Sequence, residues 1–202
     1  MRFAFTEEQE LLRREAARAL AGGGWDRSEL TDLGFLDRAV VYEEAGRANR
    51  GDELFNADAE EAERFAAVAL EATGIARYAL DVAVEHAKTR EQFGRPIGAY
   101  QAVAHPLADT YIENELARSL AYWAAWCVAE HDEQTEVAVA AAKSYAGDAA
   151  VAACERAIQV LGGIGFTWEH PLHRYYKRAL WIQAYGGYTR AQRAKVAAWL
   201  LD

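Results

Sequence analysis

Hydrophobic residues recur at helical spacing over most of the chain. In the segment 63–90 they follow one another at steps of four and three residues, which places them on one face of an α-helix. The residues of this first stripe are Val68, Ala72, Ile75, Ala79 and Val82. A second stripe with similar spacing consists of Ile112, Leu116, Leu120, Trp123 and Cys127. Both patterns predict long amphipathic helices.

A third helix is predicted after the polar turn HDEQTE. Thr135 can cap its first turn, and the apolar pattern continues over residues 135–161. One face of this helix is mostly alanine, which allows neighbouring helices to approach closely. Gly162 and Gly163 end the helix, because glycine adopts a left-handed backbone conformation more readily than other residues.

Two more helices follow towards the end of the chain. Pro171 suits the first turn of a helix with the sequence LHRYYKRALWIQAY, and a last helix follows from Tyr188. Long helices with short connections are typical of an antiparallel bundle, so we expect an up-down four-helix bundle over residues 57–202. The sequence contains no strand-rich segment and no internal repeat. The predicted fold class is therefore all-α.

The beginning of the chain differs from this bundle. Thr6 and Gln9 have the spacing of a capping box, in which each side chain satisfies a free backbone donor, ahead of a helix that runs to Leu20. The glycines of AGGGW stop that helix. Two brief helical patterns, SELTDLGFL and DRAVVYEEAGRA, follow. We expect residues 1–56 to form a short N-terminal helical segment, too small for a core of its own.

Composition and charge narrow the functional classes. The chain has 202 residues, of which 52% are hydrophobic and 26% charged, as in ordinary globular proteins. Its net charge of −9 argues against nucleic acid as a partner, because phosphate binding needs a concentrated positive surface. No uncharged run approaches the roughly 20 residues of a membrane span. The charged start does not suit a secretory signal, so we expect a cytoplasmic protein without a membrane partner. Cys127 and Cys154 lie in apolar stretches and are expected to be buried free thiols.

The segment KTREQFGRPIGAYQAVAH combines charge with a turn. Arg90 and Arg95 lie on either side of Gly94, where the backbone can approach an anion and guanidinium groups can bind phosphate oxygens. Gln101 and His105 share one helix face further on. Alternatively, Arg90 only caps a helix and His105 is an ordinary surface residue.

Two further stretches could bind a ligand. In AIQVLGGIGF, Gln159 precedes a glycine-rich helix end whose exposed amides could hold an adenosine diphosphate group, although such an end is often only a C-cap. It is not a dinucleotide-binding fingerprint, since no strand precedes it. The next helix carries a basic face made of His170, His173, Arg174, Lys177 and Arg178. Its histidines lack a third metal ligand, so we expect no metal, and its cations either bind phosphates or a partner's carboxylates or are simply solvated.

Together these stretches resemble a known family. REQFGRPIGAYQAVAHPLAD and IQVLGGIGF are similar to two segments of the C-terminal helical domain of the acyl-CoA dehydrogenases, and TEEQELLRREAARAL resembles the family's first helix. The resemblance covers residues 57–202 well and residues 4–20 loosely. It implies homo- or heterotetramers that bind FAD between subunits. It also implies α,β-dehydrogenation of an acyl-CoA thioester, in which a glutamate removes the α proton and the flavin takes a hydride.

The resemblance further implies which residues contact FAD. Those near the pyrophosphate would be Arg90, Gln92 and Phe93; those near the adenosine end Gln159, Gly162 and Gly163; and those beside the flavin Tyr188 and Arg190. We expect this FAD to be shared with a partner subunit.

The catalytic base of the family is missing from its expected positions. In many members it is the middle residue of a Tyr-Glu-Gly sequence, which here reads Tyr185-Gly186-Gly187. Other members carry the base on the first bundle helix, where alignment puts Arg64, with Glu63 one residue earlier. A shift of one residue turns a helical side chain by about 100 degrees, so Glu63 would point elsewhere. Glycine cannot accept a proton, so we expect no catalytic residue at Gly186.

The middle β-domain of the family is also missing, since the stretch between Leu20 and Ala57 has no room for one. We therefore expect a degenerate subunit of a heteromeric, FAD-dependent acyl-CoA dehydrogenase, which completes the FAD site and the oligomer of a full-length homologue. That partner would supply the acyl-CoA site, and whether this chain is itself an enzyme stays open. One alternative is a scaffold or binding module that has lost flavin. Another is an active homomeric enzyme that uses Glu63 or an unrecognised base.

Overall fold

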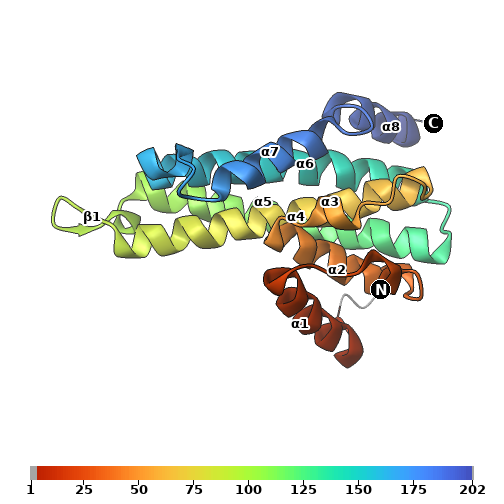
Figure 1. The fold of residues 1–202 in the computed structure, drawn as a ribbon. Helices are drawn as coiled ribbons and strands as arrows, with labels where there is room; N and C mark the ends of the chain where they lie inside the picture. The colour runs from red at the N-terminus through yellow and green to blue at the C-terminus, as the bar shows by residue number, and fades with distance from the viewer. Residues whose placement is uncertain (1–3, 202) are drawn as a thin grey trace.

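The computed structural model describes residues 4–201 and is built almost entirely of helices (Figure 1). Three long helices form its centre: α4 (Glu61–Thr89), α5 (Gln101–Glu130) and α6 (Thr135–Leu161). They pack on one another, and short connections make α4 and α6 antiparallel to α5. The shorter α7 (Leu172–Ala184) lies on α6 and α4. The predicted all-α fold class is confirmed.

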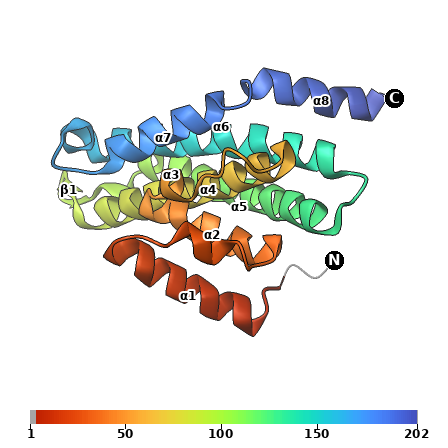
Figure 2. The same ribbon diagram turned by 45° about the vertical axis from the view of Figure 1, so that its right-hand side comes forward.

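The N-terminal segment packs on this centre. It contains α1 (Glu7–Gly22), the 3-10 turn η1 (Arg27–Leu30), α2 (Phe35–Ala48) and the single turn α3 (Gly51–Leu54). The capping box of Thr6 and Gln9 is confirmed. Helix α2 lies between α1 and α4 (Figure 2), and it can approach α4 closely because Gly46 and Gly74 carry no side chain at the crossing. A Cβ at either glycine would lie 2.0 Å from a backbone oxygen of the other helix.

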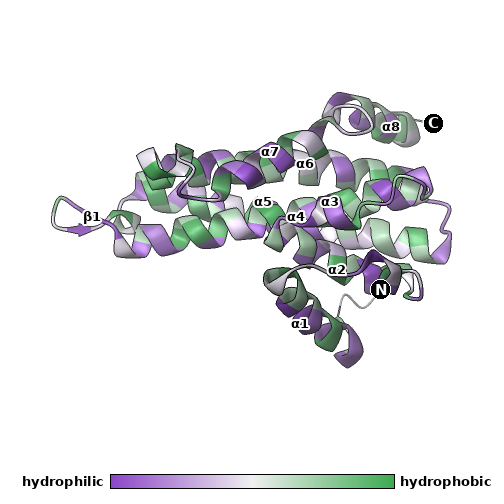
Figure 3. Cartoon of the chain, in the orientation of Figure 1, coloured by the Kyte–Doolittle hydropathy of each residue, from purple (hydrophilic) through white to green (hydrophobic). Residues whose placement is uncertain are grey.

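The stripe on α4 faces the core as predicted, but only the second half of the stripe on α5 does, where Cys127 is buried and Leu120 and Trp123 pack against the core. Ile112 and Leu116 are 55% and 51% exposed, while α5 packs on its neighbours through small residues such as Ala117, Ala121 and Ala124. The alanine face allows the shortest distance between helices, and it therefore displaces the larger side chains from the interface. Figure 3 shows hydrophobic and hydrophilic residues alternating along the helices of the bundle.

The connections agree with the sequence in most details. A small antiparallel hairpin of β1 (Glu91–Gln92) and β2 (Arg95–Pro96), followed by η2 (Ile97–Ala99), joins α4 to α5. Gly162 ends α6 with φ 66°, as expected of a helix-ending glycine. The cap predicted at Thr135 is wrong, because Thr135 is already the first residue of α6 and its hydroxyl donates to the carbonyl oxygen of Asp132 at 2.6 Å.

The end of the chain forms η3 (Gly162–Phe166), then α7, then α8 (Thr189–Leu201), which lies on α6. Pro171 directly precedes α7. Cys127 and Cys154 are buried and free, as predicted. The segment Thr135–Phe166 is long and apolar enough to span a membrane by composition alone, but half of its most apolar window is buried, as in the core helix of a globular protein.

Candidate functional site

The hairpin after α4 holds the first group of predicted FAD-contacting residues. Arg90 follows α4 directly and donates its backbone N–H to the His86 carbonyl oxygen at 2.9 Å. Phe93 and Gly94 form the tip, both with positive φ (53° and 79°), which is the backbone geometry of a tight hairpin turn. A positive φ is unfavourable for phenylalanine, and Phe93 is also 92% exposed. This strained, solvated tip is suited to contact another molecule.

Tyr100 braces the hairpin from the start of α5. Its hydroxyl donates to the Gln92 carbonyl oxygen at 3.1 Å, and the guanidinium of Arg95 lies 4.0 Å from the centre of its ring. Arg95 is thereby engaged within the chain. By contrast, the exposed side chains of Arg90 and Gln92 form no hydrogen bond within residues 4–201. They are free to bind an anion.

The second group lies at the same end of the bundle, where α6 ends (Figure 1). Gln159, Gly162 and Gly163 are all exposed. The space around both glycines is open, since a Cβ at either would meet nothing within 4 Å. Close packing therefore does not require glycine here, whereas the positive φ of Gly162 does. The surface is accessible to a ligand or a partner.

The third group lies elsewhere. Tyr188 and Arg190 stand at the beginning of α8, beyond the far end of α7, and both are exposed. Helix α7 has 13 residues, so it separates this group from the end of α6 by about 20 Å. The chain thus places Arg90, Gln92, Phe93, Gln159, Gly162 and Gly163 at the same end of the bundle and presents Tyr188 and Arg190 separately.

The Tyr185-Gly186-Gly187 turn, where the family's base is expected, leaves no room for a side chain at Gly186. Gly186 has φ 62° and Gly187 has φ 94°. A Cβ at Gly186 would lie 2.3 Å from Cε1 of Phe65, a buried residue near the start of α4. Tyr185 holds the same ring in an edge-to-face contact, with centroids 6.0 Å apart. Any side chain at Gly186 would therefore collide with Phe65.

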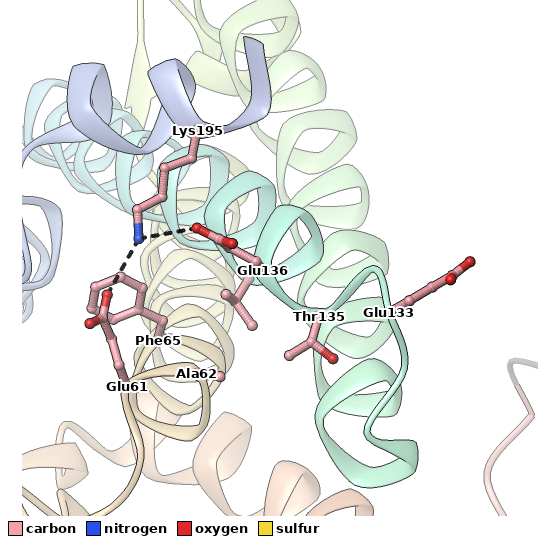
Figure 4. Close-up of a pocket in the computed structure, with 8 residues that line it drawn as sticks. Glu61, Ala62, Phe65, Glu133, Thr135, Glu136 and Lys195 are labelled. Carbon is pink, nitrogen blue, oxygen red and sulfur yellow. Dashed lines mark hydrogen bonds and ion pairs between the residues drawn. The ribbon is translucent and has the colours of Figure 1, made fainter. Parts of the chain in front are cut away.

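Lys195 covers Phe65 from the side of α8. Its ammonium lies 5.8 Å from the centre of the ring, 3.4 Å from the Glu61 carboxylate and 4.0 Å from that of Glu136. Figure 4 shows this lysine between the two glutamates, at a hollow of about 440 Å³ that Glu133 also lines. The hollow is predominantly acidic, so it does not favour an anionic acyl-CoA headgroup.

Two buried polar side chains, Lys143 and Gln192, hydrogen-bond to the backbone at this turn. The Lys143 ammonium donates to the carbonyl oxygens of Gln183 at 2.9 Å and of Gly187 at 2.5 Å. Gln192 donates to the Gly186 carbonyl oxygen at 2.9 Å. Burial lowers the pKa of Lys143 to about 8, although the nearby Asp148 carboxylate opposes the shift. Lys143 is not among the residues that the sequence predicts for the site, although its charge in the alanine-rich run VAVAAAKSYAG was a usable signal.

The second position at which the family carries a base is occupied by Arg64, next to the alternative candidate Glu63. Arg64 donates to the backbone oxygens of Ala57 and Ala59, in the loop before α4. Glu63 accepts from Arg38 of α2 at 3.5 Å. Both side chains are thus engaged with other parts of the chain, and the pairing of Glu63 with Arg38 does not favour Glu63 as a base.

Only some of the basic side chains predicted on α7 are exposed to solvent. Arg178 is bound in a bidentate pair to the buried Glu71 of α4, at 2.6 and 2.9 Å, so the expectation that it binds phosphate or a partner is wrong. Sequence spacing cannot reveal this pair, because 107 residues separate the partners. Lys177 remains exposed, 5.1 Å above the Trp168 ring. Within residues 4–201 no cluster of ligands suits a metal ion, His170 and His173 included.

Comparison with known proteins establishes the family. Residues 60–201 match the C-terminal domain of the acyl-CoA dehydrogenases. This match covers more than half of the chain. The chain therefore belongs to the acyl-CoA dehydrogenase family.

Individual relatives agree with this assignment. The chain is 49% identical over 121 residues to acyl-CoA dehydrogenase FadE34 of Mycobacterium tuberculosis, an alignment that covers 59% of this chain and 17% of that protein. Butyryl-CoA dehydrogenase of Megasphaera elsdenii is 37% identical in its solved structure, with a TM-score of 0.66 over 70% of this chain and 37% of that one. A structure named Tcur3481–Tcur3483 steroid ACAD is 35% identical, with a TM-score of 0.64 over 69% of this chain and 38% of the other. The chain thus spans well under half the length of these relatives.

Proposed function

We propose that this chain is a non-catalytic subunit of a heteromeric acyl-CoA dehydrogenase. It completes the FAD site of a full-length partner and braces the oligomer. The observation that carries the proposal is the contrast between a closed base position, in which Phe65 fills the space beside Gly186, and an open surface around Arg90 and Gln159.

The open surface fits FAD chemically. Arg90 offers a guanidinium that is not engaged within residues 4–201 and suits bidentate binding of a pyrophosphate. Gln92 and Gln159 offer carboxamides, and the space beside Gly162 and Gly163 admits a close approach of the adenosine end. FAD, when bound, supplies the hydride acceptor. This chain's own residues bind and orient it.

Proton transfer, by contrast, must come from the partner. Gly186 has no group that can accept a proton, Arg64 is a cation that donates to the loop before α4, and Glu63 is paired with Arg38. A general base has to lie within hydrogen-bond reach of the proton that it removes. The partner subunit therefore supplies both the base and the acyl-CoA site, and the relative named as a Tcur3481–Tcur3483 steroid ACAD supports a steroid-type acyl group as the first substrate to test.

The exposed apolar residues support the oligomer. Tyr111, Ile112 and Leu116 are about half exposed on α5, which is unusual for large hydrophobic side chains placed side by side on one helix. A partner that covers this face would shield these three side chains from water.

The alternative function, a scaffold that has lost flavin, also has Phe65 in the space beside Gly186. It differs from the proposed subunit only in the role of Arg90.

Co-expression with a full-length homologue tests the proposal. The two chains should co-purify as a yellow complex that oxidises an acyl-CoA, while this chain alone should hold little FAD and show no turnover. If the chain purified alone is yellow and active, the proposal is wrong. If the complex forms but its FAD content equals that of the partner alone, the scaffold alternative is correct.

A further inference from the structure

A cavity of about 200 Å³ lies between α1, α2, α4 and α5. Four arginines, three glutamates and one asparagine line it, and none of them belongs to the hairpin, to the end of α6 or to the Tyr185-Gly186-Gly187 turn. Pockets for drug-sized ligands are typically about 300–1,000 Å³, so this cavity suits a smaller molecule. Its lining is charged, so that molecule must be polar.

On one wall of the cavity, the Glu43 carboxylate has all the hydrogen-bond donors that it needs. Glu43 of α2 accepts from Arg118 at 2.5 and 3.2 Å and from the Tyr122 hydroxyl at 2.6 Å. These contacts fasten α2 to α5 and leave the carboxylate no need of a further partner. Glu43 and Arg118 therefore form the frame of the cavity.

Asn114 of α5 is not satisfied. Its side chain is 3% exposed, and within residues 4–201 its carbonyl oxygen Oδ1 accepts no hydrogen bond. A buried oxygen without a donor is unfavourable, because it has lost its hydrogen bonds to water. Asn114 lines the cavity, so a donor placed there would restore this interaction.

Two arginines of the cavity keep N–H groups without an acceptor. Arg13 donates through its terminal nitrogens to Glu10 at 3.1 Å and to Glu43 at 3.4 Å. Its Nε, however, is buried without an acceptor in the described part of the chain and lies 3.8 Å from the Glu44 carboxylate, too far for a hydrogen bond. Arg77 binds Asp81 through Nε at 2.9 Å, which leaves the remaining N–H groups of its guanidinium available. An acceptor-rich, negatively charged ligand would satisfy both arginines.

We propose that this cavity binds a small oxyanion that carries a proton, namely a monohydrogen phosphate group. Its anionic oxygens accept from Arg13 and Arg77, and its P–OH donates to Asn114 Oδ1. Sulfate has the same shape but no proton to donate at neutral pH. The cavity therefore distinguishes phosphate from sulfate, and it does so whether or not the chain contributes to a flavin site.

Titration calorimetry on the full chain tests the site, with inorganic phosphate, sulfate and glycerol phosphate as probes. Phosphate should bind about 10-fold or more tightly than sulfate, as expected for one additional hydrogen bond to a charged group. Tighter binding of inorganic phosphate than of glycerol phosphate would identify the free ion as the ligand. Glycerol phosphate is mostly a dianion without a P–OH at neutral pH, so tighter binding of this monoester than of inorganic phosphate would overturn the proposed hydrogen bond to Asn114.

Variants locate the binding. Asn114→Leu removes the acceptor at similar volume and should lower phosphate affinity to that of sulfate, about 10-fold or more. Arg77→Gln should lower the affinities for phosphate and for sulfate to a similar degree. Arg14→Gln removes an exposed charge on α1 outside the cavity and should change neither affinity.

The outcomes are decisive in either direction. Equal binding of sulfate and phosphate, binding that Asn114→Leu and Arg77→Gln leave unchanged, or no binding at all would overturn the proposal and leave a cavity that holds water. Thermal unfolding with and without phosphate is the second readout, because a ligand that binds only the folded state raises the melting temperature. Should Asn114→Leu fail to fold, Arg77→Gln decides, since the pair of Arg77 and Asp81 is partly solvent-exposed.

Discussion

The ring of Phe65 occupies the space into which a side chain at residue 186 would project. A Cβ at Gly186 would lie 2.3 Å from Cε1 and 2.4 Å from Cζ of that ring. The first long helix thus fills the position that the family's base takes in the Tyr-Glu-Gly sequence. A side chain at residue 186 would therefore require the Phe65 ring to move.

The first prediction concerns this contact. Gly186→Ala should lower the free energy of unfolding by about 1–2 kcal/mol for the left-handed backbone and by about 1–3 kcal/mol for the overlap with Phe65. Gly22→Ala, at a position with open space and no positive φ, should be nearly neutral and serves as the control. In a Phe65→Leu background the loss at Gly186 should be smaller. Equal losses in both backgrounds would show that the ring is not the obstacle.

The second prediction concerns activity. Gly186→Glu in the complex with a full-length partner should add no turnover, because Phe65 blocks the carboxylate and no acyl chain reaches this turn. Steady-state rates per flavin of the variant and wild-type complexes provide the measurement. A second active site per heterodimer would instead indicate an enzyme that lost only its base.

The third prediction concerns Arg90. Arg90→Ala should weaken FAD retention by the complex roughly 10- to 100-fold, as expected for loss of a charge-assisted hydrogen bond worth about 1.5–3 kcal/mol. Lys88→Ala is the matched control, since Lys88 is an exposed cation two residues earlier that pairs with Glu85. Circular dichroism should be unchanged in both variants. Equal FAD affinity in the two complexes would assign Arg90 to the helix end alone.

The fourth prediction concerns Lys143 and pH. Its pKa falls from the ordinary 10.5 to about 8 in the folded chain, so between these values the unfolded chain binds more protons than the folded one. Stability should therefore rise as the pH increases through this window, whereas below about pH 8 the charged, buried lysine is a constant disadvantage.

Chemical denaturation at pH 7 and pH 10 tests this dependence. Relative to Lys143→Met, the wild-type chain should gain about 2–3 kcal/mol between the two conditions, because the neutral amine still donates to Gln183 and Gly187. The comparison with Lys143→Met removes the contribution of other groups that titrate at alkaline pH. Parallel stability profiles would show that Lys143 is not desolvated.

The fifth prediction concerns the pair of Glu71 and Arg178. Arg178→Leu should lower the free energy of unfolding by about 3–5 kcal/mol, because it leaves a buried carboxylate without its partner. The double variant Glu71→Leu with Arg178→Leu should recover much of that loss. Denaturation midpoints of the single and double variants supply the test. Additive losses would mean that the two residues do not depend on each other.

The sequence alone determined the elements that depend on local interactions. Helical periodicity, the capping box of Thr6 and Gln9, and the helix-ending Gly162 involve residues within a few positions of one another, so the chain order reveals them. The motifs REQFGRPIGAYQ and IQVLGGIGF identified the family for the same reason. The sequence also shows directly that residue 186 is a glycine and carries no carboxylate.

Only the tertiary structure decided which distant residues meet. Phe65 lies beside Gly186, Lys143 beneath Gly187, and Arg178 against Glu71, at separations that no periodic pattern encodes. The same holds for α5, whose alanine face was selected for the core over Ile112 and Leu116. Helix packing depends on the shapes of both partners, and shape complementarity between segments far apart in the chain becomes apparent only when they are folded together.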